Sequence, residues 1–268
     1  MSLQPLKYLN KLAGKHVLVF GATSGIGFCI AEAAVEHGAK VVISGSNQDR
    51  INKTIERIKK SYPNTQSGQI TGHVVDLSDT ANLESNLNKL FASVSTDSKI
   101  NHIAFTTGDA LRVPPLSDTT PEDFQASGNV RTLAPLMLAK VLPKYMDLSP
   151  GNSFTLTGGT NSDRPMPGAT LMALRGASNE GLMRALAVDL APMRVNLVSP
   201  GAIQTELWSS FKSSEAEEGF VKKMTTETLL KEVGKPEDTA EAYIYAMKDR
   251  FVTGVVLHTN GGRLLANS

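Results

Sequence analysis

Residues 16–27 read His-Val-Leu-Val-Phe-Gly-Ala-Thr-Ser-Gly-Ile-Gly, and this stretch decides the fold. An apolar run that ends at a glycine is typical of a strand buried on both faces of a parallel sheet. Gly21, Gly25 and Gly27 then allow a sharp turn into a helix, which we expect over Ile26 to His37. The stretch therefore predicts a strand, a tight turn and a helix in immediate succession.

The glycine turn predicts an anion site. Free backbone N–H groups and the positive end of the helix dipole meet there, and both favour a group such as the pyrophosphate of a dinucleotide. Thr23 and Ser24 add hydroxyl donors, and Ile26 begins the helix. A chance glycine-rich turn is the alternative, because such a pattern alone is weakly specific. The order of strand, turn and helix favours the dinucleotide interpretation.

Length and composition narrow the remaining possibilities. A chain of 268 residues with 41% hydrophobic residues is long enough for one large α/β domain over residues 1–268. The net charge of +1 gives no sign of a nucleic-acid partner, and no apolar run reaches the roughly 20 residues of a membrane span. We expect a cytoplasmic protein with no nucleic-acid partner, no membrane partner and no metal. The single cysteine, Cys29, is interpreted as a buried core thiol.

The second strand indicates which dinucleotide is bound. In dinucleotide-binding folds an acidic side chain near the end of this strand binds the ribose 2′-hydroxyl and repels a 2′-phosphate. The strand expected over Lys40 to Ser44 ends without such an acid and is followed by Ser46 and Asn47. These groups and the nearby Arg50 tolerate or attract a phosphate, so we prefer NADP(H) to NAD(H). Alternatively, Arg50 is only a solvated residue on the helix expected over Gln48 to Ser61.

The glycine spacing resembles that of the short-chain dehydrogenase/reductase family, and motifs in the family's order extend from about Gly14 to Gly262. The resemblance implies an α/β fold: a single-domain Rossmann-type doubly wound parallel sheet of about seven strands, with helices on both faces. Strands are expected at residues 17–20, 40–44, 70–75, 100–105, 151–157, 193–198 and 255–257. Helices are expected at residues 26–37, 48–61, 79–94, 121–145, 169–190 and 237–248.

The same resemblance assigns further residues to the cofactor. Asp76 and Leu77 follow the third strand, where the family has an acid that meets the adenine amino group. Gly108 follows the fourth strand, and Arg175 stands at the position of the family's lysine. The segment after the sixth strand matches one whose backbone meets the carboxamide and whose threonine meets the phosphates. Its residues are Pro200, Gly201, Ile203 and Thr205.

The catalytic residues of the family are missing. An alignment on Gly151 and on residues 180–182 places Gly158 at the serine position, Leu171 at the tyrosine position and Arg175 at the lysine position. In the family the tyrosine hydroxyl exchanges a proton with the substrate oxygen, and the lysine cation lowers the pKa of that tyrosine. Leucine cannot exchange a proton, and we expect no other tyrosine close to the site.

A helix expected over Pro121 to Tyr145 carries the remaining catalytic candidates. Asn129 stands where the family has an asparagine that holds a water in its proton relay, and Arg131 follows two residues later. Residues two apart do not share a helix face, so only one of them points at the site unless the helix is distorted. Arg131 is alternatively a surface or subunit-contact arginine. A carbonyl substrate would need a donor, and either Arg131 or an acid such as Asp163 or Asp109 would serve it electrostatically.

Two later segments are expected to shape a substrate pocket. Residues 161–169 contain two prolines with Met166 between them and should cover the nicotinamide end of the site. Residues 206–224 resemble the family's substrate lid, in which Trp208 suggests an aromatic wall for a bulky apolar ligand. Packing of these aromatic side chains into the core is the alternative. The pocket residues expected from the whole chain are Asp109, Gly158, Met166, Leu171 and Trp208.

Within the superfamily the chain resembles a fungal group of atypical reductases, typified by the bifunctional reductase/Diels–Alderases of the malbrancheamide and paraherquamide indole-alkaloid pathways. The resemblance rests on residues 43–47 and 107–109, the Arg131 helix, the two-proline loop and the missing tyrosine and lysine. It implies reduction of a cationic intermediate by NADPH, then an intramolecular cycloaddition. Those enzymes rely on an arginine in this helix and an aspartate between the prolines, where this chain has Met166.

Three functions remain open at this point. The first is an NADP(H)-binding enzyme of specialised metabolism that reduces an iminium-like intermediate, acts as a Diels–Alderase or does both. An iminium ion accepts hydride without a proton donor, so the missing tyrosine suits it. The second is a pericyclase that keeps the nucleotide only as a structural element. The third is a catalytically silent NADP(H) sensor or scaffold, since a fold does not fix a function.

The resemblance also implies a homo-oligomer. Relatives in the family usually form dimers or tetramers through the two long helices, here 121–145 and 169–190. Apolar residues on the outer faces of these helices would permit such contacts, with packing inside one subunit as the alternative. They are Leu136, Leu138, Met183 and Leu186.

Overall fold

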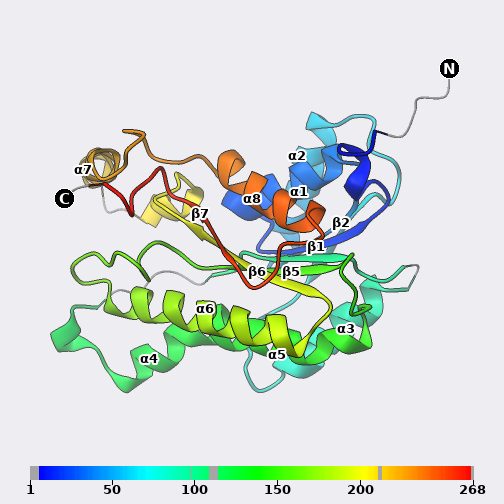
Figure 1. Cartoon of the computed structure of the whole chain (residues 1–268), viewed down its shortest axis with the longest axis horizontal. Helices are drawn as coiled ribbons and strands as arrows, with labels where there is room; N and C mark the ends of the chain where they lie inside the picture. The colour runs from blue at the N-terminus through cyan, green and yellow to red at the C-terminus, as the bar shows by residue number, and fades with distance from the viewer. Residues whose placement is uncertain (1–5, 97, 109–113, 211–212, 267–268) are drawn as a thin grey trace.

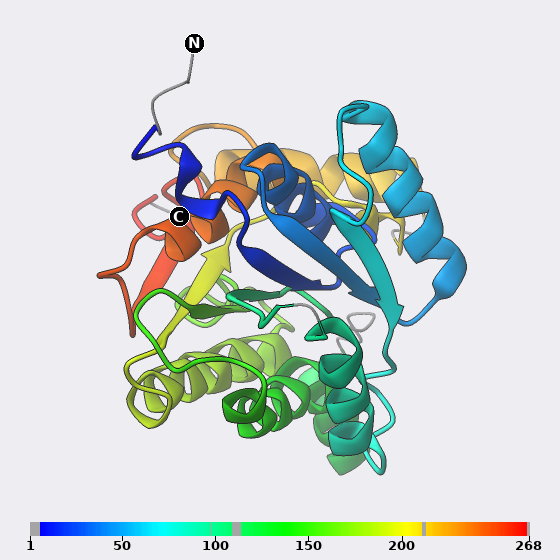
Figure 2. The same ribbon diagram turned by 90° about the vertical axis from the view of Figure 1, so that its right-hand side faces the viewer.

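A seven-stranded parallel sheet with helices on both faces forms the protein, as Figures 1 and 2 show. The computed structural model describes residues 6–96, 98–108, 114–210 and 213–266, without the side chains of residues 209 and 210. The strand order is β3-β2-β1-β4-β5-β6-β7, which confirms the predicted doubly wound topology. The strands are β1 His16–Phe20, β2 Lys40–Gly45, β3 Ile70–Val74, β4 His102–Phe105, β5 Ser153–Thr157, β6 Arg194–Pro200 and β7 Val256–Thr259.

Two layers of helices cover the sheet. Helices α1 (Gly25–Glu36), α2 (Gln48–Ser61) and α8 (Pro236–Lys248) lie on one face, and α1 packs against α8. The other face carries α3, α4, α5 and α6, while α7 lies at the end of the sheet. Their bounds are α3 Leu83–Val94, α4 Pro121–Gly128, α5 Ala134–Val141, α6 Thr170–Asp189 and α7 Ser214–Thr226. Each layer closes over its own apolar cluster, because central strands bury both faces.

The carboxyl ends of β1 and β4 define the crevice of the sheet. β1 pairs with β2 on one side and with β4 on the other, so the order of the strands reverses there. Ligands of open parallel sheets bind outside the carboxyl ends of the strands at such a point. The turns that follow these two strands touch: a Cβ atom built on Gly21 would lie 2.8 Å from the backbone nitrogen of Thr107.

The long helix expected over residues 121–145 is wrong, because the structure divides it. Helix α4 ends at Gly128, a π-helix covers Asn129–Leu133, and α5 starts at Ala134. Pro135 explains the interruption. It has no N–H to donate to the carbonyl of Arg131 four residues earlier, and its ring collides with that carbonyl in a regular α-helix.

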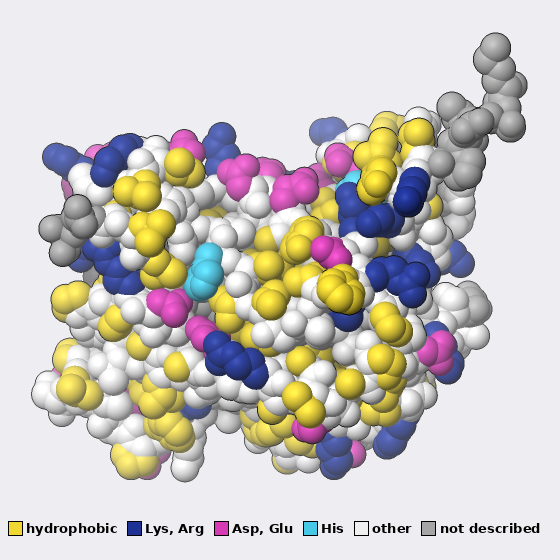
Figure 3. All heavy atoms as spheres, in the orientation of Figure 1, with side chains coloured by type: hydrophobic (Ala, Val, Ile, Leu, Met, Phe, Trp, Pro, Cys, Tyr) yellow, Lys and Arg dark blue, Asp and Glu magenta, His cyan; other side chains and the backbone are white. Residues whose placement is uncertain are grey.

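Three of the four residues expected at an outer helix face are core residues. Leu138, Met183 and Leu186 are buried in the cluster beneath α3, α5 and α6, whereas Leu136 is exposed. On the face drawn in Figure 3, side chains of both charge signs are interspersed with apolar ones. In the described part of the chain, no helix combines the length and the apolar character that crossing a membrane requires. Cys29 is buried as predicted, and burial raises the pKa of its thiol to about 12.

His102 on β4 links the stability of the fold to pH. Its side chain is 1% exposed, and its Nδ1 atom lies 2.9 Å from the hydroxyl oxygen of Ser153 on β5. Burial lowers the pKa of His102 from its ordinary 6.5 to about 3, and the positive charges of Arg194 and Lys15 act in the same direction. The folded protein therefore holds this imidazole neutral where an unfolded chain would protonate it.

We expect the free energy of unfolding to fall as the pH drops below 6.5. His102 should contribute about 1.4 kcal/mol of this decrease for each pH unit. The sign follows because between the two pKa values the unfolded chain binds one more proton at His102 than the folded protein does. Urea unfolding over this pH range should show that His102→Gln removes the slope, whereas His258→Gln at an exposed position keeps it. Equal slopes in wild type and His102→Gln would contradict the assignment.

Candidate functional site

An open cleft of about 470 Å³ runs along the carboxyl ends of the strands. The turns after β1, β2, β4, β5 and β6 form its floor, and α7 contributes to its far end. Most residues predicted to bind a cofactor line this cleft. They are Gly21, Thr23, Ser24, Gly25, Ile26, Gly27, Ser46, Arg50, Gly108, Pro200, Gly201, Ile203 and Thr205.

The turn after β1 fits a dinucleotide pyrophosphate. Gly21 has φ +80° and Gly25 has φ +53°, a region that L side chains rarely adopt. A Cβ atom on Gly27 would collide with the carbonyl oxygen of Gly21 and lie 2.5 Å from the Thr106 hydroxyl. The backbone therefore borders the cleft directly, with the N-terminus of α1 facing it.

Four residues expected at the cofactor lie outside the lining of the cleft, namely Asn47, Asp76, Leu77 and Arg175. Asn47 caps α2 by accepting a hydrogen bond of 3.0 Å from the N–H of Arg50. Leu77 is buried in the core beside α3. Asp76 is exposed and accepts hydrogen bonds from the backbone and hydroxyl of Ser78, which lower the pKa of its carboxyl.

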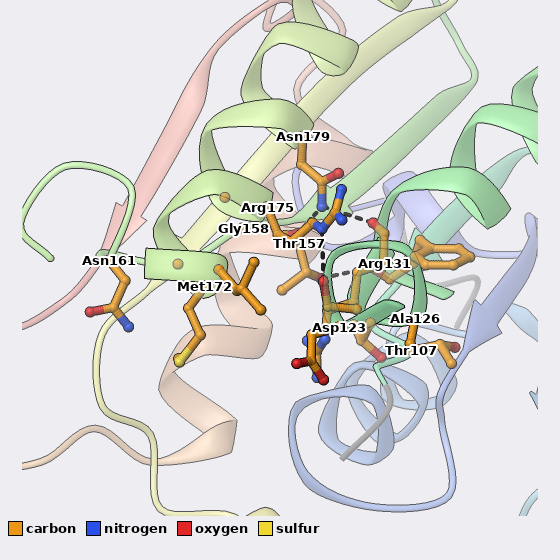
Figure 4. A pocket seen from close by; sticks show the side chains of 16 residues that line it. Thr107, Asp123, Ala126, Arg131, Thr157, Gly158, Asn161, Met172, Arg175 and Asn179 are labelled. Atoms are coloured by element: carbon orange, nitrogen blue, oxygen red, sulfur yellow. Dashed lines mark hydrogen bonds between the residues drawn. The ribbon is translucent and has the colours of Figure 1, made fainter. Parts of the chain in front are cut away.

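A second cavity of about 280 Å³ adjoins the cleft between α4, the π-helix and α6 (Figure 4). The two spaces are adjacent, because they share lining residues at the carboxyl ends of β4 and β5, on the π-helix and on α6. The shared residues are Thr106, Thr107, Arg131, Thr157, Gly158, Gly159, Asn161 and Met172. Gly158 at the expected serine position thus faces both spaces.

Arg131 lies at the junction of the two spaces and lines both. Its guanidinium rests on Gly108: a Cβ atom built there would lie 2.5 Å from the Cζ atom of Arg131. Asn129 lines neither space, so of the two helix candidates only Arg131 faces the site. The glycine after β4 therefore provides the room that this arginine occupies.

On α6, Met172 lines the cleft, whereas the motif alignment indicates Leu171. Leu171 lines only the second cavity, whereas its neighbour Met172 lines both spaces. Arg175 points away from the cleft, with its Cζ atom 4.3 Å from the centre of the Phe124 ring. A shift of one residue rotates a side chain by about 100° around a helix, which accounts for the difference.

A tyrosine lies closer to the site than expected. The hydroxyls of Tyr243 on α8 and Thr157 on β5 share a hydrogen bond of 2.6 Å, and Thr157 lines both spaces. Tyr243 is fully buried, which raises the pKa of its phenol, and it does not line either space. Among the described lining residues there is neither a tyrosine nor a lysine.

Asp163, one of the two expected acids, does not line the site, but an acid that was not expected does. Asp163 is exposed and lines neither space, and Asp109 lies outside the described residues. Asp123 is 5% exposed and lines the second cavity. Its carboxylate also accepts the N–H of Thr120 in a capping box, so in the sequence it looked like an ordinary start of a helix. The described residues contain no cluster of His, Cys, Asp and Glu suited to a metal.

Apolar side chains close the cleft on the side of α7. Trp208, 9% exposed, contacts the Phe220 ring edge to face at 5.2 Å, and both line the cleft with Met166, Leu207 and Met224. The two alternatives for Trp208 are therefore compatible, since it is packed and also faces the cleft. These side chains offer flat apolar surfaces to a ligand.

Arg263, which sequence reasoning did not find, joins three parts of this region. It is buried and donates to the carboxylate of Glu227 at 3.0 and 3.1 Å and to the hydroxyl of Thr160 at 3.2 Å. Glu227 follows α7, and Thr160 lies in the loop after β5. The ion pair thus ties the end of the lid to the floor of the cleft, although no local motif marks it.

Known proteins share this architecture. A model of the SDR-like Rossmann domain matches residues 8–266. The short-chain dehydrogenase/reductase malC of Malbranchea aurantiaca is 44% identical over 257 residues, covering 95% of this chain and 96% of that protein. The solved structure of MalC reductase/Diels–Alderase from that organism has a TM-score of 0.90 at 42% identity, covering 96% of this chain and 99% of that one.

A second fungal relative is similar over the same extent. The short-chain dehydrogenase/reductase fsr5 of Gibberella fujikuroi is 40% identical over 261 residues, covering 97% of this chain and 98% of that protein. The family resemblance seen in the sequence is confirmed over nearly the whole chain. This protein belongs to the short-chain dehydrogenase/reductase family, with fungal enzymes of the MalC type among its relatives.

Proposed function

We propose that the protein is an NADP(H)-dependent enzyme that reduces a bulky, apolar, iminium-like substrate and provides a cavity for its intramolecular cycloaddition. One observation carries the proposal: the cofactor cleft and the second cavity lie side by side, with Arg131 lining both and neither tyrosine nor lysine in the described lining. The similarity to MalC, which is named as a reductase/Diels–Alderase, supports it.

The cleft residues divide the binding of the dinucleotide among them. N–H groups at the start of α1 would face the pyrophosphate, and Ser46 and Arg50 after β2 would receive a ribose 2′-phosphate. Pro200 and Ile203 would meet the nicotinamide end. When bound, the reduced cofactor supplies hydride. The chain's own residues bind it, orient it and keep water from its reactive end.

Arg131 is suited to orientation rather than to proton transfer. A guanidinium stays protonated at all accessible pH values and presents several N–H donors in a fixed plane. It would therefore hold an oxygen atom of the substrate in place without giving up a proton. An iminium carbon accepts hydride without protonation of its nitrogen, so no further acid is needed. A neutral carbonyl would need one.

Met166 gives the cycloaddition a specific observation in its favour. The side chain lies in the cleft among Met172, Trp208 and Phe220, where the resemblance would place an aspartate. Methionine adds apolar, adaptable surface at that point. A cycloaddition needs the reacting groups folded together in such a space but no proton transfer. A pericyclase that retains the nucleotide as an orienting element is therefore the second candidate.

We expect purified protein to bind NADPH about tenfold more tightly than NADH, because Arg50 adds a charge-assisted contact to the 2′-phosphate. Energy transfer from Trp208, which faces the cleft, would report binding. Arg50→Ala should remove the preference. Loss of nicotinamide absorbance on adding an indole-alkaloid iminium compound would support the reductase, and product analysis would then look for a cycloadduct.

The outcomes separate the candidates. A cycloadduct formed with NADPH bound but not consumed would move the assignment to the pericyclase. Binding with no change in any substrate would contradict both enzyme functions and favour a sensor. Absence of NADPH binding would overturn the cofactor assignment itself.

Glu206 gives a further prediction about the cofactor. Its Oε2 atom accepts a hydrogen bond of 2.8 Å from the N–H of Gly25, at the point where a pyrophosphate would bind. We expect Glu206→Gln to tighten NADPH binding about two- to fivefold, because it removes a negative charge from the positive end of α1. Glu218→Gln, at an exposed position of α7, is the matched control. Weaker binding in Glu206→Gln would show that this carboxylate does not compete with the cofactor.

Arg131→Met should lower kcat about a hundredfold while leaving the Kd for NADPH within about twofold, because orientation of the substrate is lost and the cofactor cleft is kept. Gly108→Ala keeps the charge of Arg131 but displaces its guanidinium, since the added Cβ atom would lie 2.5 Å from the Cζ atom of Arg131. This variant should reproduce most of the loss in kcat. Single-turnover kinetics measure both, with exposed Arg184→Met as the control. Unchanged turnover in Arg131→Met would remove Arg131 from the site.

A further inference from the structure

Two buried polar side chains of α6 face the interrupted helix that carries Arg131. Arg175 is 9% exposed and Asn179 is 5% exposed, and their spacing of four residues places them on the same face of α6. Arg175 donates to the backbone carbonyl of Phe124 in α4. Asn179 donates to the backbone carbonyl of Arg131 in the π-helix, as Figure 4 shows. Neither Arg175 nor Asn179 lines the cofactor cleft.

Arg175 holds the last turn of α4. Its Nη2 atom donates to the carbonyl of Phe124, and its Nε atom donates to the hydroxyl of Ser127 at 3.2 Å. Its guanidinium also lies over the Phe124 ring. Phe124 lies one turn before Gly128, the last residue of α4. Arg175 therefore ties the C-terminal half of α4 to α6 just before the π-helix begins.

Asn179 supplies a donor that the sequence removes. The carbonyl of Arg131 would bond to the N–H of residue 135 in an α-helix, but residue 135 is proline. The Nδ2 atom of Asn179 donates to this carbonyl at 2.9 Å and to the carbonyl of Thr157 on β5 at 3.3 Å. The π-helix is thereby tied to α6 and to the sheet at the residue whose side chain enters the site.

Gly128 completes the arrangement. It is the last residue of α4, and a Cβ atom built on it would lie 2.7 Å from the Cζ atom of Arg175. A larger residue would push the guanidinium from the end of the helix. Gly108 leaves room for the guanidinium of Arg131 in the same way. Gly128 thus leaves room for Arg175, and Gly108 leaves room for Arg131.

We propose that Arg175 and Asn179 are positioning residues: they brace the π-helix Asn129–Leu133 and thereby hold the guanidinium of Arg131 at the junction of the two spaces. The proposal rests on the proposed function for the use made of Arg131. Relaxation of the π-helix by one residue would turn Arg131 by about 100° and take it off Gly108. The cation at residue 175 therefore acts through backbone geometry rather than on the cofactor.

Hydrogen–deuterium exchange of the ligand-free protein tests the brace without any assumption about activity. We expect Arg175→Met to raise exchange of the amides at residues 128–134 about tenfold, because the end of α4 loses its cation. Gly128→Ala should do the same through displacement of the guanidinium, and Arg175→Lys should recover part of the protection. Arg184→Met is the matched control, since that arginine of α6 is exposed and pairs with Glu180 on its own helix.

Exchange at residues 128–134 that equals wild type in both Arg175→Met and Gly128→Ala would overturn the proposal. If Arg175→Met does not fold, Gly128→Ala and Arg175→Lys still decide it. Faster exchange throughout the protein, rather than at this segment, would also count against a local brace.

Kinetics provide a second readout. Arg175→Met and Asn179→Leu should lower kcat about ten- to a hundredfold with the Kd for NADPH within about twofold, and neither should worsen Arg131→Met when combined with it. A loss of NADPH affinity equal to the loss in kcat would make Arg175 a cofactor ligand and overturn the proposal. If wild type has no turnover, the proposed function fails, while the exchange measurement still decides the brace.

Discussion

The contact between two turns at the carboxyl edge of the sheet is the constraint on which the rest of the structure depends. Gly21, after β1, lies against Thr106 and Thr107, after β4, with no space for a side chain between them. This contact brings the N-terminus of α1 to the cleft. It also places Gly108 opposite the π-helix, where Arg131 lies. One packing requirement therefore shapes both the candidate anion site and the place for the arginine.

The second constraint is a proline inside a helix, Pro135. It gives a structural role to Arg175, which stands at the position of the family's lysine. Pro135 prevents a regular helix, so the backbone around Arg131 needs donors from outside. Arg175 and Asn179 on α6 provide them. The described lining contains no tyrosine, so it holds no phenol whose pKa a neighbouring cation must lower. A cation on this helix can then hold backbone carbonyls, which is where the structure places it.

The sequence predicts the sheet well because its signals are local. The apolar run before Gly21 and the glycine turn are enough for β1 and α1, and similar runs locate the other strands. The division of the helix had a signal in Pro135, which outweighs the apolar pattern around it. The choice of Met172 over Leu171 had none, because motif spacing tolerates an error of one residue and a helix face does not. The sequence did not mark Asp123 as a site residue, because a capping box is a sufficient reason for an acid at the start of a helix.

The two proposed activities, hydride transfer and cycloaddition, both require that the residues of the site orient the substrate. Arg131 cannot release a proton, and Tyr243 lies behind Thr157 in the core. Asp123 is the one carboxylic acid in the described lining of the second cavity. Such a lining favours reactions in which the substrate needs no proton, and both hydride transfer to an iminium carbon and a cycloaddition meet that condition. Both depend on orientation in an enclosed apolar space. The described lining therefore suits both proposed reactions, because neither of them needs a tyrosine or a lysine there.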